Sequence, residues 1–299
     1  MKILVCGSEG MVGSNVVRIL ESKYRGKVYT ADLKHGVDLR DPRDCKLVTR
    51  NCDQIFHLAD RTVGIGYSST HHGQMMTDSL LISLNLLEAA RKAGVKDYLY
   101  VSSSCVYEGD LGDDKIVFPY PPELSNAGYG WAKCIAERQC IYYAREYGMR
   151  TVIARPANIY GPSYDWTRPV EDMHVIPALI VKMLRKHKEI TIWGSGNQTR
   201  TFQYESNAAS LIVRLMENGQ SGEAYNLGGL ELPIRGVAAA IAVVCKYSGE
   251  IRFDESKPEG PSRKAQDFSK IEALLGPEYY CEDKPSLELT IAAARETLG

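Results

Sequence analysis

A tyrosine, a lysine and a serine in the middle of the chain have the types and spacing of an acid–base set. Tyr129 and Lys133 stand four positions apart, so a helix through them places both side chains on one face. A free tyrosine, with a pKa near ~10, is a poor base at neutral pH, but a neighbouring ammonium stabilises the phenolate. Ser103 would hold a substrate oxygen opposite Tyr129. The set suits oxidation of an alcohol, although Tyr-x-x-x-Lys also occurs by chance on many helices.

A glycine-rich turn near the N-terminus predicts a dinucleotide site. The apolar run 2–6 leads into Gly7-Ser-Glu-Gly10-Met11-Val12-Gly13, which opens an amphipathic helix. Glycines at this spacing allow a tight turn and let the backbone, here including Met11 and Val12, approach a pyrophosphate at the helix N-terminus. The pattern alone is weak, and an acid about twenty residues later strengthens it.

That acid is Asp32, at the end of the run 28–32. Its carboxylate can accept hydrogen bonds from both ribose hydroxyls and would repel a 2′-phosphate, so NAD is favoured over NADP, with Lys34 close enough to weaken the preference. Asp38 and Leu39 follow as a predicted adenine contact, and a solvated acidic turn is the equally open alternative. The predicted cofactor is therefore NAD, with NADP the less favoured form.

Apolar runs and amphipathic segments alternate along the first half of the chain. This alternation predicts an α/β fold, a doubly wound parallel sheet of the Rossmann type. Leu58 and Ala59, at the end of the third run, should meet the cofactor, because ligands gather at the carboxyl ends of such strands. The predicted strands are 2–6, 28–32, 54–59, 98–101 and 151–154, and the predicted helices include 80–93, 129–147 and 208–217.

The composition changes after about residue 160, where proline, tryptophan and charged residues become frequent. We expect residues 1–160 to form the dinucleotide-binding domain, with later returns near 193–227. Residues 161–192 and 228–299 should form a smaller C-terminal α/β substrate-binding lobe. The segment 107–127, rich in glycine, aspartate and proline, is predicted to be a loop over the site.

Composition argues against several classes of protein. A net charge of -1 over 299 residues gives no basic field for nucleic acid or an anionic membrane. No apolar run reaches the ~18 residues of a membrane span, and no signal peptide precedes the first strand, so a cytoplasmic protein is expected. The eight cysteines form no Cys-x-x-Cys pair, which indicates neither a zinc site nor a disulfide framework.

Taken together and in order, these motifs resemble the extended short-chain dehydrogenase/reductases that act on nucleotide sugars. The resemblance rests on the glycine turn, Asp32, Ser103, Tyr129-x-x-x-Lys133 and Arg155-Pro-x-Asn-x-Tyr-Gly-Pro162, and it covers nearly the whole chain. The 4,6-dehydratases of this family carry Asp-Glu where this chain has Ser104 and Cys105. Ser-x-Cys-x-Tyr is similar instead to the GDP-sugar epimerases, namely GDP-mannose 3,5-epimerase and GDP-fucose synthase.

The resemblance implies a second catalytic pair. In GDP-fucose synthase a cysteine works with the histidine of a His-Val-(Ile/Leu)-Pro segment, and this chain has His174-Val-Ile-Pro177. Cys105 and His174 would then be proton carriers, with pKa values near ~8.5 and ~6.5 that bracket neutral pH. Without the resemblance, Cys105 reads as a packing residue and His174 as a polar residue before a helix.

The resemblance also implies substrate contacts and leaves the cofactor choice open. Val63-Gly64-Ile-Gly66 resembles a substrate loop, Asn158 and Arg200 are candidates for the sugar and the diphosphate, and Arg263 is a second cation, with a solvated face as its alternative. The synthase consumes NADPH, whereas Asp32 favours NAD. An epimerase that retains NAD therefore fits this chain better than a reductase.

The predicted function is 3- and/or 5-epimerisation of a GDP-linked sugar through a 4-keto intermediate. Open alternatives are a GDP-fucose-synthase-like epimerase-reductase, a 4-epimerase or variant dehydratase, and a binding protein that senses NAD; the intact Ser103, Tyr129 and Lys133 disfavour the last. The apolar stripe of the helix 80–93 and the helix of Tyr129 imply a homodimer, as in the family.

Overall fold

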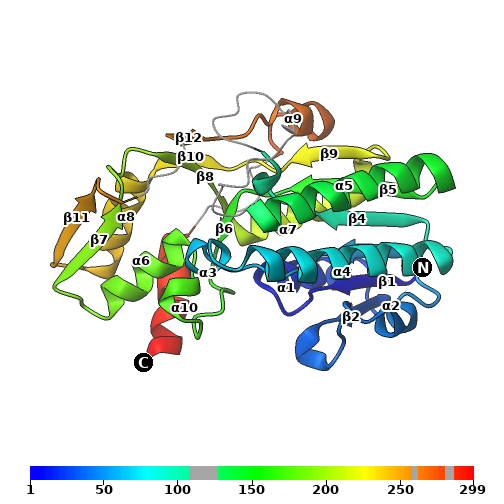
Figure 1. Ribbon diagram of the computed structural model, residues 1–299, viewed down its shortest axis with the longest axis horizontal. Coiled ribbons are helices and arrows are strands. Elements are labelled where there is room, and N and C mark those ends of the chain that lie inside the picture. Colours follow the sequence, from blue (N-terminus) through cyan, green and yellow to red (C-terminus); the bar gives the residue numbers. More distant parts are fainter. Residues whose placement is uncertain (108–126, 258–261, 280–285) are drawn as a thin grey trace.

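The computed structural model describes residues 1–107, 127–257, 262–279 and 286–299, and a six-stranded parallel sheet forms its centre (Figure 1). All neighbouring strands of this sheet run parallel. The predicted doubly wound fold is confirmed. In spatial order the strands are β2 (Val28–Ala31), β1 (Ile3–Cys6), β3 (Gln54–His57), β4 (Asp97–Val101), β5 (Arg150–Arg155) and β9 (Glu223–Asn226).

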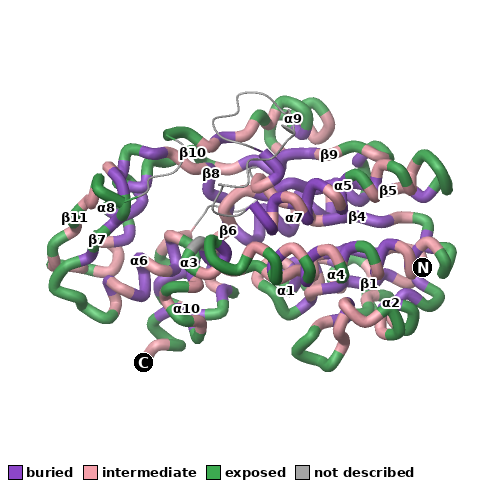
Figure 2. Tube along the Cα trace, in the orientation of Figure 1, coloured by how far each residue is buried: buried purple, intermediate pink, exposed green. Residues whose placement is uncertain are grey.

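Helices cover both faces of the sheet. Buried side chains of α1 (Met11–Lys23) and α7 (Glu205–Asn218) share one apolar core with the strands. Those of α2 (Pro42–Val48), α4 (His72–Lys92) and α5 (Ala127–Tyr147) share a second core on the opposite face. In Figure 2 the buried residues follow the strands and the exposed ones follow the outer sides of the helices. With apolar cores on both faces, the sheet must be buried on both sides.

A second group of elements lies beside the carboxyl edge of the sheet (Figure 1). A small sheet is built on β8, and a separate parallel pair joins β7 to β11. An apolar core of its own links these strands to three helices. The elements are β6 (Asn158–Tyr160), α6 (Val175–Leu184), β7 (Glu189–Trp193), β8 (Thr199–Tyr204), β10 (Leu230–Pro233), α8 (Ile234–Cys245), β11 (Glu250–Asp254), β12 (Arg263–Lys264) and α10 (Leu287–Leu298).

Short helices connect these elements, and several lie at the site described below. They are the 3-10 helices η1 (Leu33–His35), η2 (Ser104–Val106) and η3 (Val170–Asp172), together with α3 (Ile65–Ser68) and α9 (Ser269–Leu275). Residues 108–126 of the predicted loop over the site, and Cys281, lie outside the described residues.

The helix predicted over 80–93 begins eight residues earlier, at His72. The buried residues of its first two turns are Met75, Asp78 and Ser79, and the last two use polar groups to contact the rest of the protein. Because the inward face is polar there, apolar periodicity ends at residue 80 and does not reveal these turns. Within the described part of the chain, no helix has the length and apolar character to cross a bilayer.

Candidate active site

The glycine turn has the shape that a pyrophosphate requires. Gly7 has a φ of 80°, and a Cβ on it would lie 2.6 Å from the backbone nitrogen of Ala59. A Cβ on Gly13 would collide with the Gly7 carbonyl oxygen. The first turn of α1 holds no acidic side chain, so its N–H groups present positive charge only. These residues fit the diphosphate of a dinucleotide.

Asp32 lies beside this turn at the end of β2. Its two carboxylate oxygens accept hydrogen bonds from the backbone nitrogens of Glu9 and Lys34, each at 3.0 Å. The first bond ties the acid to the glycine turn itself, and the second caps η1. A carboxylate in this place is oriented toward the region where the ribose of a dinucleotide at the turn would lie.

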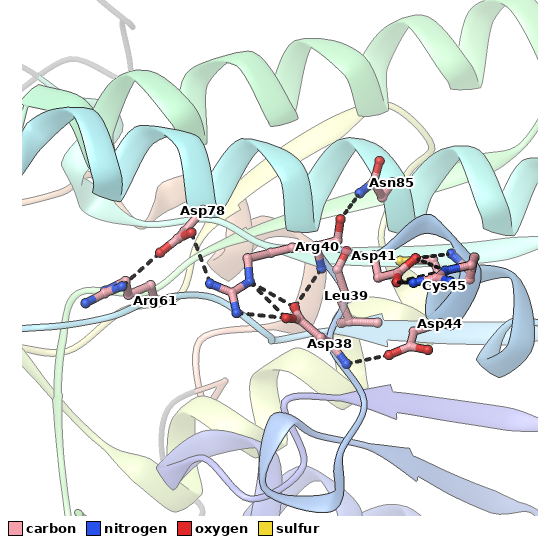
Figure 3. Close-up of polar contacts among 10 residues, drawn as sticks. Asp38, Leu39, Arg40, Asp41, Asp44, Cys45, Arg61, Asp78 and Asn85 are labelled. Carbon is pink, nitrogen blue, oxygen red and sulfur yellow. Dashed lines mark hydrogen bonds and ion pairs between the residues drawn. The ribbon is translucent and has the colours of Figure 1, made fainter.

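The predicted adenine contact is part of an ion-pair chain shown in Figure 3. The Asp38 carboxylate accepts from Nε and Nη2 of Arg40, and the nearby Arg40 guanidinium lowers the pKa of Asp38. Arg40 also reaches Asp78 on α4 at 3.2 Å, and Asp78 pairs with Arg61 at 2.9 Å. Leu39 is buried beneath this chain. The loop that follows β2 is thereby joined to the loop that follows β3.

A cavity of about 360 Å³ opens beside the glycine turn at the carboxyl edge of the sheet. Most of the predicted site residues meet there, although they come from elements far apart in the sequence. The predicted residues that line it are Gly7, Gly10, Met11, Val12, Gly13, Leu58, Ser103, Cys105, Tyr129, Lys133, Asn158, His174 and Arg200. Those that do not line it are Asp32, Asp38, Leu39, Ala59, Gly64 and Arg263.

Tyr129 and Lys133 face each other on α5, as their spacing predicts. The Lys133 Nζ lies 5.4 Å from the centre of the Tyr129 ring and donates a hydrogen bond of 2.8 Å to the Val101 carbonyl. Burial raises the pKa of Tyr129 well above its usual range, while Lys133 lowers it. The spacing of the two residues predicts only the effect of the lysine, and in the fold the effect of burial on the Tyr129 pKa is the larger one.

A carboxylate that the sequence analysis did not select lies in this cavity. Asp60, three residues after the end of β3, forms an ion pair of 2.6 Å with Lys133, and both side chains are almost completely buried. Burial would raise the pKa of Asp60, but the ammonium of Lys133 and hydrogen bonds hold it below its usual range. The sequence signal that could have revealed Asp60 is its position as an acid at the carboxyl end of the predicted buried strand 54–59.

Ser103 and Cys105 lie at the start of η2. The Ser103 hydroxyl accepts a hydrogen bond of 3.1 Å from the Cys105 backbone nitrogen and so caps this short helix. The Cys105 side chain is partly exposed where it lines the cavity. By contrast Cys134, on the inner side of the same segment, is buried against Val106 and Tyr107.

A network of buried hydrogen bonds holds residues 102–107 in place. The Ser102 hydroxyl donates to Glu137 on α5, and Glu137 is bound by two nitrogens of Arg155 at 2.9 and 2.6 Å. Arg155 also donates to the Tyr107 hydroxyl at 2.6 Å. Both ends of the segment 102–107 are therefore bonded to residues of the main sheet and the Tyr129 helix.

His174 enters the cavity from the opposite lobe, as the N-cap residue of α6. Its side chain is accessible from the cavity although protein atoms surround it on most sides. This environment and the nearby charge of Arg168 lower the pKa of His174. Gly64 holds the neighbouring chain in place, since its backbone nitrogen donates to the Asp172 carbonyl at 2.7 Å.

The small sheet contributes polar and basic groups. Asn158 lines the cavity and donates to the Thr201 carbonyl at 2.9 Å, and Arg200 lines it from β8. On β12 the predicted Arg263 points away from the cavity and forms two 2.8 Å hydrogen bonds with Glu231. Its neighbour Lys264 lines the cavity instead, because successive side chains of a strand point to opposite faces.

A Rossmann sheet with this glycine turn, next to a cavity that holds Tyr129 and Lys133, defines a dinucleotide-dependent enzyme of the short-chain dehydrogenase/reductase class. Residues 3–228 match the NAD dependent epimerase/dehydratase family, and the chain belongs to this family. The resemblance predicted from the motifs is therefore confirmed.

The relatives sharpen this assignment. A GDP-L-fucose synthase of Sinorhizobium fredii is 30% identical, over 99% of this chain and 95% of its own length. GDP-mannose 3,5-epimerase 1 of Oryza sativa subsp. indica is also 30% identical, over 92% and 77%. The solved UDP-glucose 4-epimerase of Thermotoga maritima superposes with a TM-score of 0.84 at 26% identity, covering 100% of both chains. The protein is thus an NAD(P)-dependent enzyme of the nucleotide-sugar epimerase and reductase type.

Proposed function

We propose that this enzyme epimerises a GDP-linked sugar at C3, C5 or both, through a 4-keto intermediate, and retains NAD through the cycle. One observation supports this above all. A single cavity holds the pair Tyr129 and Lys133 and also two further proton carriers, Cys105 and His174, that come from different lobes. A simple alcohol oxidation needs only the first pair.

When bound, NAD supplies the hydride acceptor for C4 and the donor for its return. Tyr129 takes the proton of the C4 hydroxyl as the hydride leaves, and Lys133 favours the phenolate that this requires. Ser103 would hold the same oxygen. The hydrogens at C3 and C5 are acidic next to the new ketone, so Cys105 and His174 can remove a proton on one face and return one on the other.

NAD is the proposed cofactor because of the charge around the ribose position. The Asp32 carboxylate is fixed by the Glu9 backbone, and the Glu9 side chain lies 3.8 Å from His35. Two acids at this end of the turn would repel a 2′-phosphate. NADP is the less favoured cofactor.

The proposed substrate contacts use the residues of the second lobe. Arg200 and Lys264 are the cations that line the cavity from β8 and β12, where a diphosphate would require them. Asn158, which also lines the cavity, would contact the sugar. Lys264, and not the predicted Arg263, is therefore the proposed second cation for the diphosphate.

A GDP-fucose-synthase-like epimerase-reductase is the second candidate. Its support is His174-Val-Ile-Pro177 at the start of α6, together with a 30% identical relative that carries that name. The two functions differ in stoichiometry, since a reductase consumes one reduced cofactor per product and an epimerase consumes none.

We further propose a homodimer through α4 and α5. These helices pack side by side (Figure 1), and their outer faces expose large apolar side chains, namely Leu81, Leu84, Tyr142 and Tyr147. Light scattering at micromolar concentration should give twice the 33.3 kDa chain mass, and a monomer would contradict the proposal.

The test of the function is turnover in deuterated water. The wild-type enzyme with NAD is offered GDP-linked hexoses, heptoses and their 4-keto-6-deoxy forms, and NMR locates the deuterium. We expect deuterium at C3 or C5 with no net change in NADH. Inversion at C4 alone, with no deuterium at carbon, would make the enzyme a 4-epimerase. In a parallel reaction supplied with NADPH, one NADPH consumed per product would favour the reductase.

A further inference from the structure

Asp60 has a geometry that the proposed mechanism does not use. It lies three residues after the end of β3, at the carboxyl edge of the sheet, its side chain is 4% exposed, and it lines the cavity. One carboxylate oxygen accepts from the Ser79 hydroxyl at 2.6 Å and from the Arg61 backbone nitrogen at 2.7 Å. The other lies 2.6 Å from the Lys133 Nζ. The carboxylate is therefore fixed on one side and paired on the other.

Contacts with the protein also fix the position of the Lys133 ammonium. Its ammonium donates to the Val101 carbonyl at 2.8 Å and lies 4.8 Å from the centre of the Tyr100 ring. Its side chain is 3% exposed. A buried ammonium is costly unless a charge of opposite sign accompanies it.

Among the residues that the structure describes, Asp60 is the carboxylate available to accompany Lys133. Glu137, one turn further along α5, is already paired with Arg155. His57 on β3 is neutral at physiological pH, because burial and the charge of Lys133 lower its pKa to about 3. The remaining neighbours, Tyr100 on β4 with Tyr129 and Cys140 on α5, carry no negative charge at neutral pH, since burial raises the pKa of each.

We propose that Asp60 is a positioning residue of this active site, which keeps Lys133 protonated and directs its ammonium between Tyr129 and the nicotinamide ribose of bound NAD. The inference rests on the roles proposed above for Tyr129 and Lys133. Without Asp60, the buried lysine would lose its proton at a lower pH, and the cofactor would lose a charged hydrogen-bond donor. Ser79 assists by orienting the carboxylate.

The test measures NAD affinity by calorimetry between pH about 7 and about 9.5, a range in which an unperturbed lysine begins to titrate. It needs no sugar, so it can succeed even if the proposed epimerisation fails. The variants are Asp60→Asn, Asp60→Glu and Ser79→Ala. Asp97→Asn is the matched control, because Asp97 pairs with Arg150 at the far edge of the sheet.

Wild-type affinity should stay nearly constant over this range. Asp60→Asn should lose about tenfold or more at the upper end, because a neutral amine is the weaker donor. Asp60→Glu should restore most of the wild-type profile, and Asp97→Asn should match it. A wild-type profile for Asp60→Asn would overturn the inference. If that variant does not fold, Ser79→Ala decides: a smaller loss in the same direction supports the inference, and an unchanged profile overturns it.

Discussion

The two halves of the cavity are built differently. Tyr129, Lys133 and Asp60 lie on or next to the main sheet, deeply buried, and an ion pair of 2.6 Å joins two of them. Cys105 and His174 lie at the starts of a short 3-10 helix and of α6, with side chains accessible from the cavity. The half to which we assign redox chemistry is thus enclosed, whereas the half to which we assign proton transfer is open to the cavity. We infer that the first half determines the chemistry at C4 and the second determines which carbon is inverted.

The largest effect is expected on the redox half. Tyr129→Phe removes the proton acceptor and should lower hydride transfer by about 10³- to 10⁴-fold, since general acid–base groups contribute about that much. NAD binding should persist. Stopped-flow reduction of NAD measures the rate, and Tyr142→Phe, exposed on the same helix, is the control. Retention of more than a tenth of the activity would contradict the proposed role of Tyr129.

The second prediction concerns the support below the cavity. Glu137→Ala leaves the Arg155 guanidinium buried without its carboxylate, which should cost about 3–5 kcal/mol of unfolding free energy. Glu217→Ala breaks the exposed pair with Lys23 and should cost less than about 1 kcal/mol. Urea denaturation compares the two. Equal losses would show that burial of the Glu137–Arg155 pair adds nothing to its contribution to stability.

The third prediction concerns the stability of the main sheet at acidic pH. The pKa of buried His57 is about 3, below the ~6.5 of an unfolded chain, so only the unfolded state gains its proton as pH falls between these values. Stability is therefore lost on acidification, by about 1.4 kcal/mol per pH unit from this residue. His57→Gln should reduce that slope, and exposed His187→Gln should not. Identical slopes for wild type and His57→Gln in denaturation at pH 4–6 would disprove it.

The smallest effect is expected where the cavity meets the second lobe. Arg200→Ala should raise the KM for the nucleotide sugar about tenfold, because a guanidinium matches diphosphate oxygens. Arg263→Ala should change it less than about twofold, since its side chain points outward to Glu231. Initial rates at varied substrate give both values, and a larger effect at Arg263 would reverse the assignment.

The sequence predicts the features that depend on neighbouring residues better than those that depend on contacts between distant residues. The parallel sheet and the positions of Tyr129 and Lys133 were predicted from local patterns, since apolar runs and an i, i+4 spacing are short-range signals. The partner of Lys133 was not, because Asp60 lies 73 positions away in sequence and only the order of β3 and β4 brings it there.

The remaining differences also have physical causes. The first turns of α4 bury Asp78 and Ser79 beside Met75, so their inward face carries one apolar residue and not a periodic apolar signal. On β12 the choice between Arg263 and Lys264 depends on which face of the strand meets the cavity, and a two-residue strand is too short for its pattern to reveal that.

The central claim is that Cys105 carries a proton at carbon, and one comparison tests it most directly. Cys105→Ala and Cys134→Ala are each incubated in deuterated water with a sugar that the wild type turns over, and NMR follows deuterium at C3 and C5. Cys134 is the matched control because it is buried beside the same segment but does not line the cavity. We predict that Cys105→Ala loses deuterium incorporation by about 100-fold or more while reduction of NAD by the sugar persists, and that Cys134→Ala matches the wild type. Incorporation at the wild-type rate in Cys105→Ala would contradict the account.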